Sequence, residues 1–164
     1  MSISWFKLLR SIIIKVFLTL ALVLLVPTTS YAASLEEPSQ IYIPSAAITL
    51  PVHTAKIAYN TWEVSENSAS FGEGTALPGS AGNTVIFAHA REGLFGTLPE
   101  VHVGDLIYVF TLHDWFAYRV TERLIVPPTQ TDVIQGKKGA ELTLFTCTGP
   151  KDSHRLVLKA ILES

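Results

Sequence analysis

The sequence predicts an all-β domain, either a two-sheet sandwich or a small closed barrel. Three observations indicate this class. Short runs of apolar or alternating residues recur from residue 41 onward, turn residues such as Gly, Pro, Asn and Asp separate them, and helical periodicity is scarce. Seven or eight strands are expected. The length of residues 33–164 suits a single domain.

Residues 1–32 are interpreted as a targeting segment. Basic residues precede an apolar run, "VFLTLALVLLV" (16–26), which Pro27 ends. Small residues near Ala32 fit a secretory cleavage site. The alternative is an uncleaved membrane anchor over residues 5–26, although a spanning helix needs about 20 apolar residues. Both interpretations place the rest of the chain outside the cytoplasm.

The first half of the domain follows a polar linker, residues 33–40. "IYIP" (41–44) and "AITLPV" (47–52) are short β-like runs whose prolines suit strand starts or sheet edges. "TWEV" (61–64) is a third short run. "TVIFAH" (84–89) is a compact apolar strand after the turn sequence "PGSAGN".

The second half of the domain contains the longer strands. "DLIYVFTL" (105–112) and "WFAYRVTERLIV" (115–126) form a hairpin around a turn at 113–114, and two prolines end the second run. The last two strands are 140–147 and 155–162. A short helical turn is expected in 54–60 or in 129–135. Four large apolar side chains are expected to be packing residues: Trp62, Phe95, Leu98 and Trp115.

The charge of the domain is mildly negative. All 14 acidic residues and nine of the 12 basic residues lie in 33–164, which gives a formal charge of about −5. Without a basic stripe, nucleic acid is not expected as a partner. No two histidines have metal-ligand spacing and no Cys-x-x-Cys occurs, so no zinc or copper site and no cofactor is expected.

Cys147 is the only cysteine and ends the run "ELTLFTC". A single thiol in an exported protein can pair with another molecule, be an inert buried residue, or be a reactive group. Strand alternation places Cys147 on one face with Thr143 and Phe145. The loop 148–154 follows. A strand end beside a loop can hold a thiol rigidly and keep it accessible.

Arg155 opens the next strand, so a hairpin would return it close to Cys147. There it would favour the thiolate or hold an oxyanion, and the alternative is a surface ion pair. A cysteine nucleophile also needs a partner, usually histidine. His89 ends the strand 84–89 beside a loop, and His154 is its obvious competitor. Structural or solvated roles are expected for His53, His102 and His113.

Several motifs then resemble one family. "TLFTC" (143–147) followed by Arg155 resembles the TLxTC…R signature of sortases, the cysteine transpeptidases of bacterial cell surfaces. "IYIPSAAITLPV" (41–52) looks like their first strand pair. "ALPGSAGNTVIFAHA" (76–90) is similar to their PG…GN…GH segment, and "LFGTLPEVHVGDLIYV" (94–109) to their F-x-x-L…GD-x-I-x-V stretch. Together these segments cover nearly all of 41–162 in the right order.

The resemblance implies a fold, a site and a reaction for residues 41–164. The fold would be a closed, roughly eight-stranded β-barrel, and the catalytic residues would be His89, Cys147 and Arg155. The enzyme would cleave an LPxTG-like sorting signal between Thr and Gly through a thioacyl-enzyme on Cys147. An amine, from a peptidoglycan cross-bridge or a pilin lysine, would then resolve it. The alternatives are an exported cysteine peptidase that hydrolyses the thioester and a non-catalytic exported barrel.

Some residues depart from the family pattern. Ala88 stands where the family usually has Gly, and Ala90 where the residue is often polar. The segment 127–140 contains one acidic residue, Asp132, so no calcium site is expected there. Thr146 faces away from the nucleophile in an ideal strand and is expected to have a supporting role at most.

Overall fold

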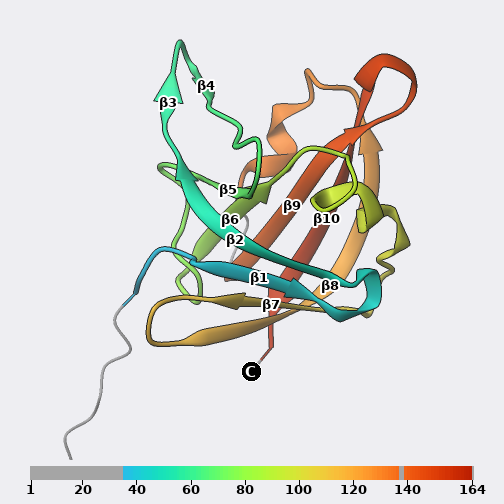
Figure 1. Cartoon of the computed structure of the whole chain (residues 1–164). Helices are drawn as coiled ribbons and strands as arrows, with labels where there is room; N and C mark the ends of the chain where they lie inside the picture. Colours follow the sequence, from blue (N-terminus) through green and yellow to red (C-terminus); the bar gives the residue numbers. More distant parts are fainter. Residues whose placement is uncertain (1–34, 137–138, 164) are drawn as a thin grey trace, which may run out of the picture. The chain divides into compact units, whose positions relative to one another are not determined.

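The described residues form a closed β-barrel (Figure 1). The computed structural model describes residues 35–136 and 139–163, so the predicted targeting segment lies outside the described residues. Around the barrel the strands follow the order β1, β2, β5, β6, β9, β10, β8 and β7, and β1 pairs with β7 to close the sheet. The prediction of an eight-stranded closed barrel is confirmed.

The elements have the following bounds. The barrel strands are β1 (Gln40–Ile43), β2 (Ile48–Ala55), β5 (Ala69–Gly72), β6 (Gly82–Phe87), β7 (Leu106–Phe110), β8 (Trp115–Val126), β9 (Ala140–Thr148) and β10 (His154–Leu162). A separate hairpin consists of β3 (Ile57–Ala58) and β4 (Thr61–Trp62). Four short 3-10 turns are η1 (Pro44–Ala46), η2 (Phe95–Glu100), η3 (Thr131–Ile134) and η4 (Pro150–Asp152). No helix among the described residues is long and apolar enough to cross a membrane.

The direction of β6, β9 and β10 brings three chain segments to one end of the barrel. β6 pairs with β9 in parallel, so both strands finish at the same end of the sheet. β10 is antiparallel to β9 and begins beside the end of β9. The end of β6, the end of β9 and the start of β10 therefore lie next to one another.

The core follows from strand alternation. On β2, buried Ile48, Leu50 and Val52 alternate with exposed neighbours, as a half-buried strand requires. Phe95 and Leu98 of η2 are fully buried in the same core, which confirms their predicted packing role. The largest fully buried side chain is Tyr118 of β8.

The "PGSAGN" turn is held by a buried hydroxyl. The backbone N–H of Gly79 donates a hydrogen bond of 2.8 Å to the Tyr118 hydroxyl. Burial raises the pKa of Tyr118, so the hydroxyl stays neutral. Gly79 has φ +78°, and a Cβ there would lie 2.2 Å from the Phe116 ring. Glycine is therefore required both by the backbone conformation and by the close approach of the ring.

Some local predictions are corrected by the structure. Of the two places predicted for a helical turn, 129–135 contains η3, but 54–60 contains the end of β2, the strand β3 and the turn of the hairpin β3–β4. Tyr59 and Asn60 have positive φ at its turn, which is the geometry of a two-residue hairpin loop. Trp115 was expected to pack, but it is 61% exposed and contacts Tyr108 from the outer face.

Candidate active site

Cys147 and Arg155 stand opposite each other on neighbouring strands. The antiparallel register of β9 and β10 pairs Cys147 with Arg155 directly. Cys147 is a free, half-buried cysteine next to the last residue of β9. It lies on the strand face of Phe145, while Thr146 points into the barrel and is buried. The hairpin that the sequence predicts thus brings the arginine beside the thiol.

His89 approaches from the other side of β9. β6 runs parallel to β9 with Phe87 opposite Phe145, and two residues further along stand His89 and Cys147. The strand 84–89 that the sequence predicts ends at Phe87, so His89 lies in the loop just past it. The hydroxyl of Thr146 donates a hydrogen bond of 2.7 Å to the Ala88 carbonyl, which ties the two strand ends together.

The three side chains line one pocket of about 210 Å³. Trp62 and Phe87 form an apolar wall beside them. The rings are stacked in a row: Trp62 on Phe87 at 5.5 Å and Phe87 on Phe145 at 4.8 Å between centroids. The thiol, the imidazole and the guanidinium therefore share one small cavity with an aromatic side. A cysteine nucleophile needs such a base and such a positive charge beside it.

Arg155 is oriented by the loop that precedes it. Its Nη1 donates hydrogen bonds of 3.0 Å to the carbonyls of Asp152 and His154. These neutral acceptors fix the side chain without cancelling its charge. A guanidinium always carries its proton at working pH and offers several donors, so the remaining N–H groups can bind an oxyanion.

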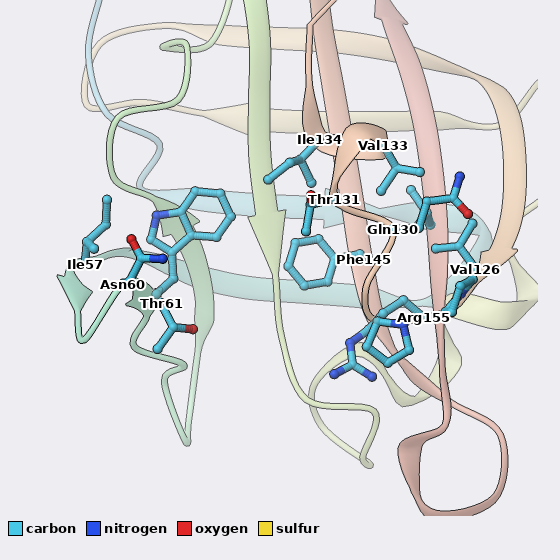
Figure 2. Close-up of a pocket in the computed structure, with 14 residues that line it drawn as sticks. Ile57, Asn60, Thr61, Val126, Gln130, Thr131, Val133, Ile134, Phe145 and Arg155 are labelled. Atoms are coloured by element: carbon cyan, nitrogen blue, oxygen red, sulfur yellow. The ribbon is translucent and has the colours of Figure 1, made fainter.

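A larger apolar pocket of about 410 Å³ adjoins the first (Figure 2). The two pockets share four lining residues, Thr61, Trp62, Phe145 and Arg155. Figure 2 shows the hairpin residues Ile57, Asn60 and Thr61 on one side, and Phe145 with the residues of η3 on the other. We call the two adjoining pockets the groove.

A buried amide connects the barrel strands to one wall of the groove. Asn83 of β6 donates a hydrogen bond of 2.7 Å from Nδ2 to the carbonyl of Ile134 in η3. Its Oδ1 accepts a bond of 2.9 Å from the Thr143 hydroxyl on β9. The second residue of the Gly-Asn pair in "PGSAGN" thus links two strands to the far wall of the groove.

Glu66 contacts both His89 and Arg91, and the sequence motifs predicted neither Glu66 nor Arg91 as a site residue. Glu66 Oε1 lies 3.5 Å from His89 Nε2, and Arg91 Nη2 lies 3.3 Å from Glu66 Oε2. Arg91 Nη2 also donates a hydrogen bond to the Glu66 backbone carbonyl. Because Glu66 is far from His89 in the chain, no local pattern could have linked them.

The competing histidines lie elsewhere. His154 is exposed, and its Nδ1 lies 2.9 Å from the Ser153 hydroxyl. His113 contacts Glu36 at 2.7 Å through Nδ1, at the turn between β7 and β8. His53 and His102 are exposed. None of these four lines the groove. Within the described ranges, no three His, Cys, Asp or Glu side chains cluster as metal ligands would.

Comparison with protein families identifies the domain. The family model described as "Sortase domain" matches residues 41–163. Sortase A of Streptococcus agalactiae is 28% identical over 135 residues, covering 75% of this chain and 51% of that protein. Sortase A of Listeria monocytogenes is 38% identical over 62 residues, covering 38% of this chain and 28% of that protein. The chain thus spans about half of these curated relatives or less.

Solved structures give the same result. A sortase D5 transpeptidase from Clostridium perfringens superposes with a TM-score of 0.67 at 28% identity, covering 78% of this chain and 79% of that one. Sortase A from Corynebacterium diphtheriae gives a TM-score of 0.68 at 28% identity, covering 78% of this chain and 61% of that one. The fold of the described residues is therefore similar to that of these solved sortase structures.

Proposed function

The chain belongs to the sortase family, and on that premise we propose that it is a cysteine transpeptidase acting on exported proteins. Its substrate would carry an LPxTG-like sorting signal, cleaved between Thr and Gly. The observation that supports this proposal most is the convergence of His89, Cys147 and Arg155 on one pocket. The sequence motifs predict the same three residues, and we propose that all three are catalytic.

The first half of the reaction forms a thioester. The thiolate of Cys147 bonds to the carbonyl carbon of the Thr residue in the signal, and the carbonyl oxygen becomes an oxyanion. Arg155 and a backbone N–H near Cys147 stabilise that charge. His89 gives its proton to the nitrogen of the departing Gly residue, the C–N bond breaks, and the acyl group stays on sulfur.

The second half of the reaction transfers the acyl group. His89 takes a proton from an incoming amine, whose nitrogen attacks the thioester carbonyl. The C–S bond breaks and the Cys147 thiolate is restored. The acceptor would be the amine of a peptidoglycan precursor or a pilin lysine, and it must outcompete water at ~55 M through proximity.

The groove gives the signal a binding surface. Its larger part is lined by apolar groups of Ile57, Val126, Ile134 and Phe145. An extended peptide whose Thr carbonyl lies at Cys147 would place its Leu and Pro side chains in this part. Burial of those two side chains would contribute about 25 cal/mol per Å² of apolar surface removed from water.

We also propose where the enzyme works. It would work on the outer face of the cell membrane, anchored through residues 5–26, or in secreted form after cleavage of the leader. Residues 1–32 would be that leader, 33–40 a linker and 41–164 the catalytic domain.

Ligation of peptides tests the proposal. The full chain is incubated with a panel of LPxTG-like peptides and candidate amines, and products are identified by mass spectrometry. We expect a peptide–amine product from the wild-type chain and none from Cys147→Ala. Hydrolysed peptide alone, even with amine in excess, would favour the peptidase alternative. If the thiol also resists alkylating reagents and no peptide is cleaved, the chain is a non-catalytic module.

The choice of histidine is tested in the same assay. His89→Ala should abolish ligation, because no other imidazole lines the pocket. His154→Ala should leave most of the activity, because its ring contacts Ser153 outside the groove. The opposite pattern would show that His154 is the partner of Cys147.

A further inference from the structure

We propose that Glu66 is a positioning residue for His89, held in place by Arg91. This inference rests on the proposed function, because it gives His89 a fixed orientation for its proton transfers. The three side chains come from two separate loops, 63–68 and 88–94, that meet beside the pocket.

The loop that carries Glu66 is fixed by a small hydroxyl network. The backbone N–H of Ser65 donates to the Ser70 hydroxyl at 3.0 Å, and the Ser68 hydroxyl donates to that of Ser65 at 2.6 Å. Ser68 and Ser70 are buried. Glu66 itself is 72% exposed, but the residues on both sides of it are anchored. The hydrogen bonds of the loop therefore hold the backbone of Glu66 in place.

Arg91 is also fixed by its own loop. Its carbonyl accepts hydrogen bonds from the N–H groups of Leu94 and Gly96, and its N–H donates to the carbonyl of His89. A Cβ at residue 96 would lie 2.7 Å from the Arg91 carbonyl, so glycine permits this tight turn. From there Arg91 contacts both the carboxylate and the backbone carbonyl of Glu66.

The nitrogen that faces Glu66 is shielded from water. His89 Nε2 has no solvent access and no hydrogen-bond partner, although the His89 side chain as a whole is 37% exposed. The part of the His89 ring that water can reach therefore does not include Nε2. The carboxylate at 3.5 Å is slightly beyond a normal hydrogen bond, and catalytic contacts often tighten when substrate binds.

The chemical consequence concerns the two ring nitrogens. An Nε2–H that donates to Glu66 fixes the tautomer and the rotation of the ring. Nδ1 is then the nitrogen that gives a proton to the leaving amine and takes one from the incoming amine. Fixing a base through a third group is the general arrangement of nucleophile–base pairs. Because Glu66 is exposed, water screens its charge, so hydrogen-bond orientation is its main contribution.

A spectroscopic experiment tests the orientation without any substrate. The full chain, labelled with ¹⁵N-histidine and held in detergent, is studied by NMR at alkaline pH, with His89→Gln used to assign the signals. We expect the Nε2–H tautomer at His89 in the wild type and in Glu66→Gln, whose amide oxygen still accepts. Glu66→Ala should give a mixture. The same tautomer in all three proteins would overturn the inference, whether or not the chain proves to be a transpeptidase.

A kinetic experiment tests the consequence for catalysis. Glu66→Ala should lower kcat about tenfold at an unchanged KM, as loss of an orienting partner does. Glu66→Gln should have a kcat within about threefold of the wild-type value, since the hydrogen-bond acceptor remains. Glu63→Ala, in the same loop and exposed, is the matched control and should behave as wild type. An equal loss of kcat in Glu66→Ala and Glu66→Gln would contradict positioning by a hydrogen bond.

A double-mutant cycle separates the role of Arg91. Arg91→Ala alone should lower kcat less than Glu66→Ala does. In the Glu66→Ala background it should have no further effect, because Arg91 acts only through Glu66. Additive losses would show instead that Arg91 reaches the substrate by itself. Melting temperatures of all variants confirm that each is folded.

Discussion

At the scale of single residues, Thr146 explains why the site has its shape. Alternation along β9 correctly predicts that it points away from Cys147. What alternation cannot predict is its partner, the Ala88 carbonyl, because the parallel pairing of β6 and β9 depends on the whole fold. The same reason hides Glu66 from sequence reasoning. The residues that we propose to react could be predicted from motifs, whereas the residues that contact them could not.

We predict that Thr146→Val destabilises the fold and slows the reaction. Valine keeps the shape but leaves the buried Ala88 carbonyl without its donor, at a cost of about 1–3 kcal/mol. The ends of β6 and β9 would then be free to separate, so kcat should fall while KM changes little. Denaturant titration and ligation kinetics measure both effects. Thr49→Val, on the exposed face of β2, is the control, and equal behaviour of the two variants would refute the prediction.

At the scale of elements, most strands were predictable, including the four-residue β1, whereas β5 and the hairpin turn after β3 were not. β7, β8, β9 and β10 carry clear alternation or turn residues at their ends. The four residues of β5 are all buried and show no alternation, so the sequence gives no strand signal there. The hairpin β3–β4 turns at Tyr59-Asn60 without a glycine, which removes the usual hairpin signature.

We expect the amide of Asn83 to affect peptide binding in the groove more than the rate of the chemical steps. Asn83→Ala leaves the Ile134 carbonyl and the Thr143 hydroxyl without their partner, at a cost of about 1–3 kcal/mol for a buried group. Because η3 loses its tie to β6, KM for the peptide should rise several-fold while kcat is nearly kept. Asn67→Ala, at an exposed position of the loop 63–68, should change neither constant. A loss confined to kcat would show that Asn83 acts on the reacting groups instead.

At the scale of the whole molecule, one short strand closes the barrel. β1 pairs with both β2 and β7, so a strand of four residues joins the two ends of the sheet. Its inward residues Ile41 and Ile43 are fully buried. The closed sheet was predicted through the family resemblance, since strand patterns alone fit a sandwich equally well.

Ile41→Ala should therefore weaken the entire barrel in one step. Replacing a fully buried isoleucine with alanine lowers the free energy of unfolding by about 2–5 kcal/mol. Circular dichroism and fluorescence should both report one unfolding transition, at a lower denaturant concentration than in the wild type. Gln40→Ala, exposed on the same strand, should shift stability by less than about 0.5 kcal/mol. Two separate transitions in Ile41→Ala would mean that the β6, β9 and β10 end of the barrel folds without closure.

The central claim is that the sulfur of Cys147 carries the cleaved peptide as a thioester. The most direct measurement is intact and peptide-level mass spectrometry of the full chain, quenched in acid shortly after mixing with a sorting-signal peptide. The account predicts an adduct with the mass of the fragment ending at Thr, located on Cys147 and discharged when an amine is added. Cleavage of the peptide with no adduct at Cys147, or an adduct that persists in Cys147→Ala, would contradict it.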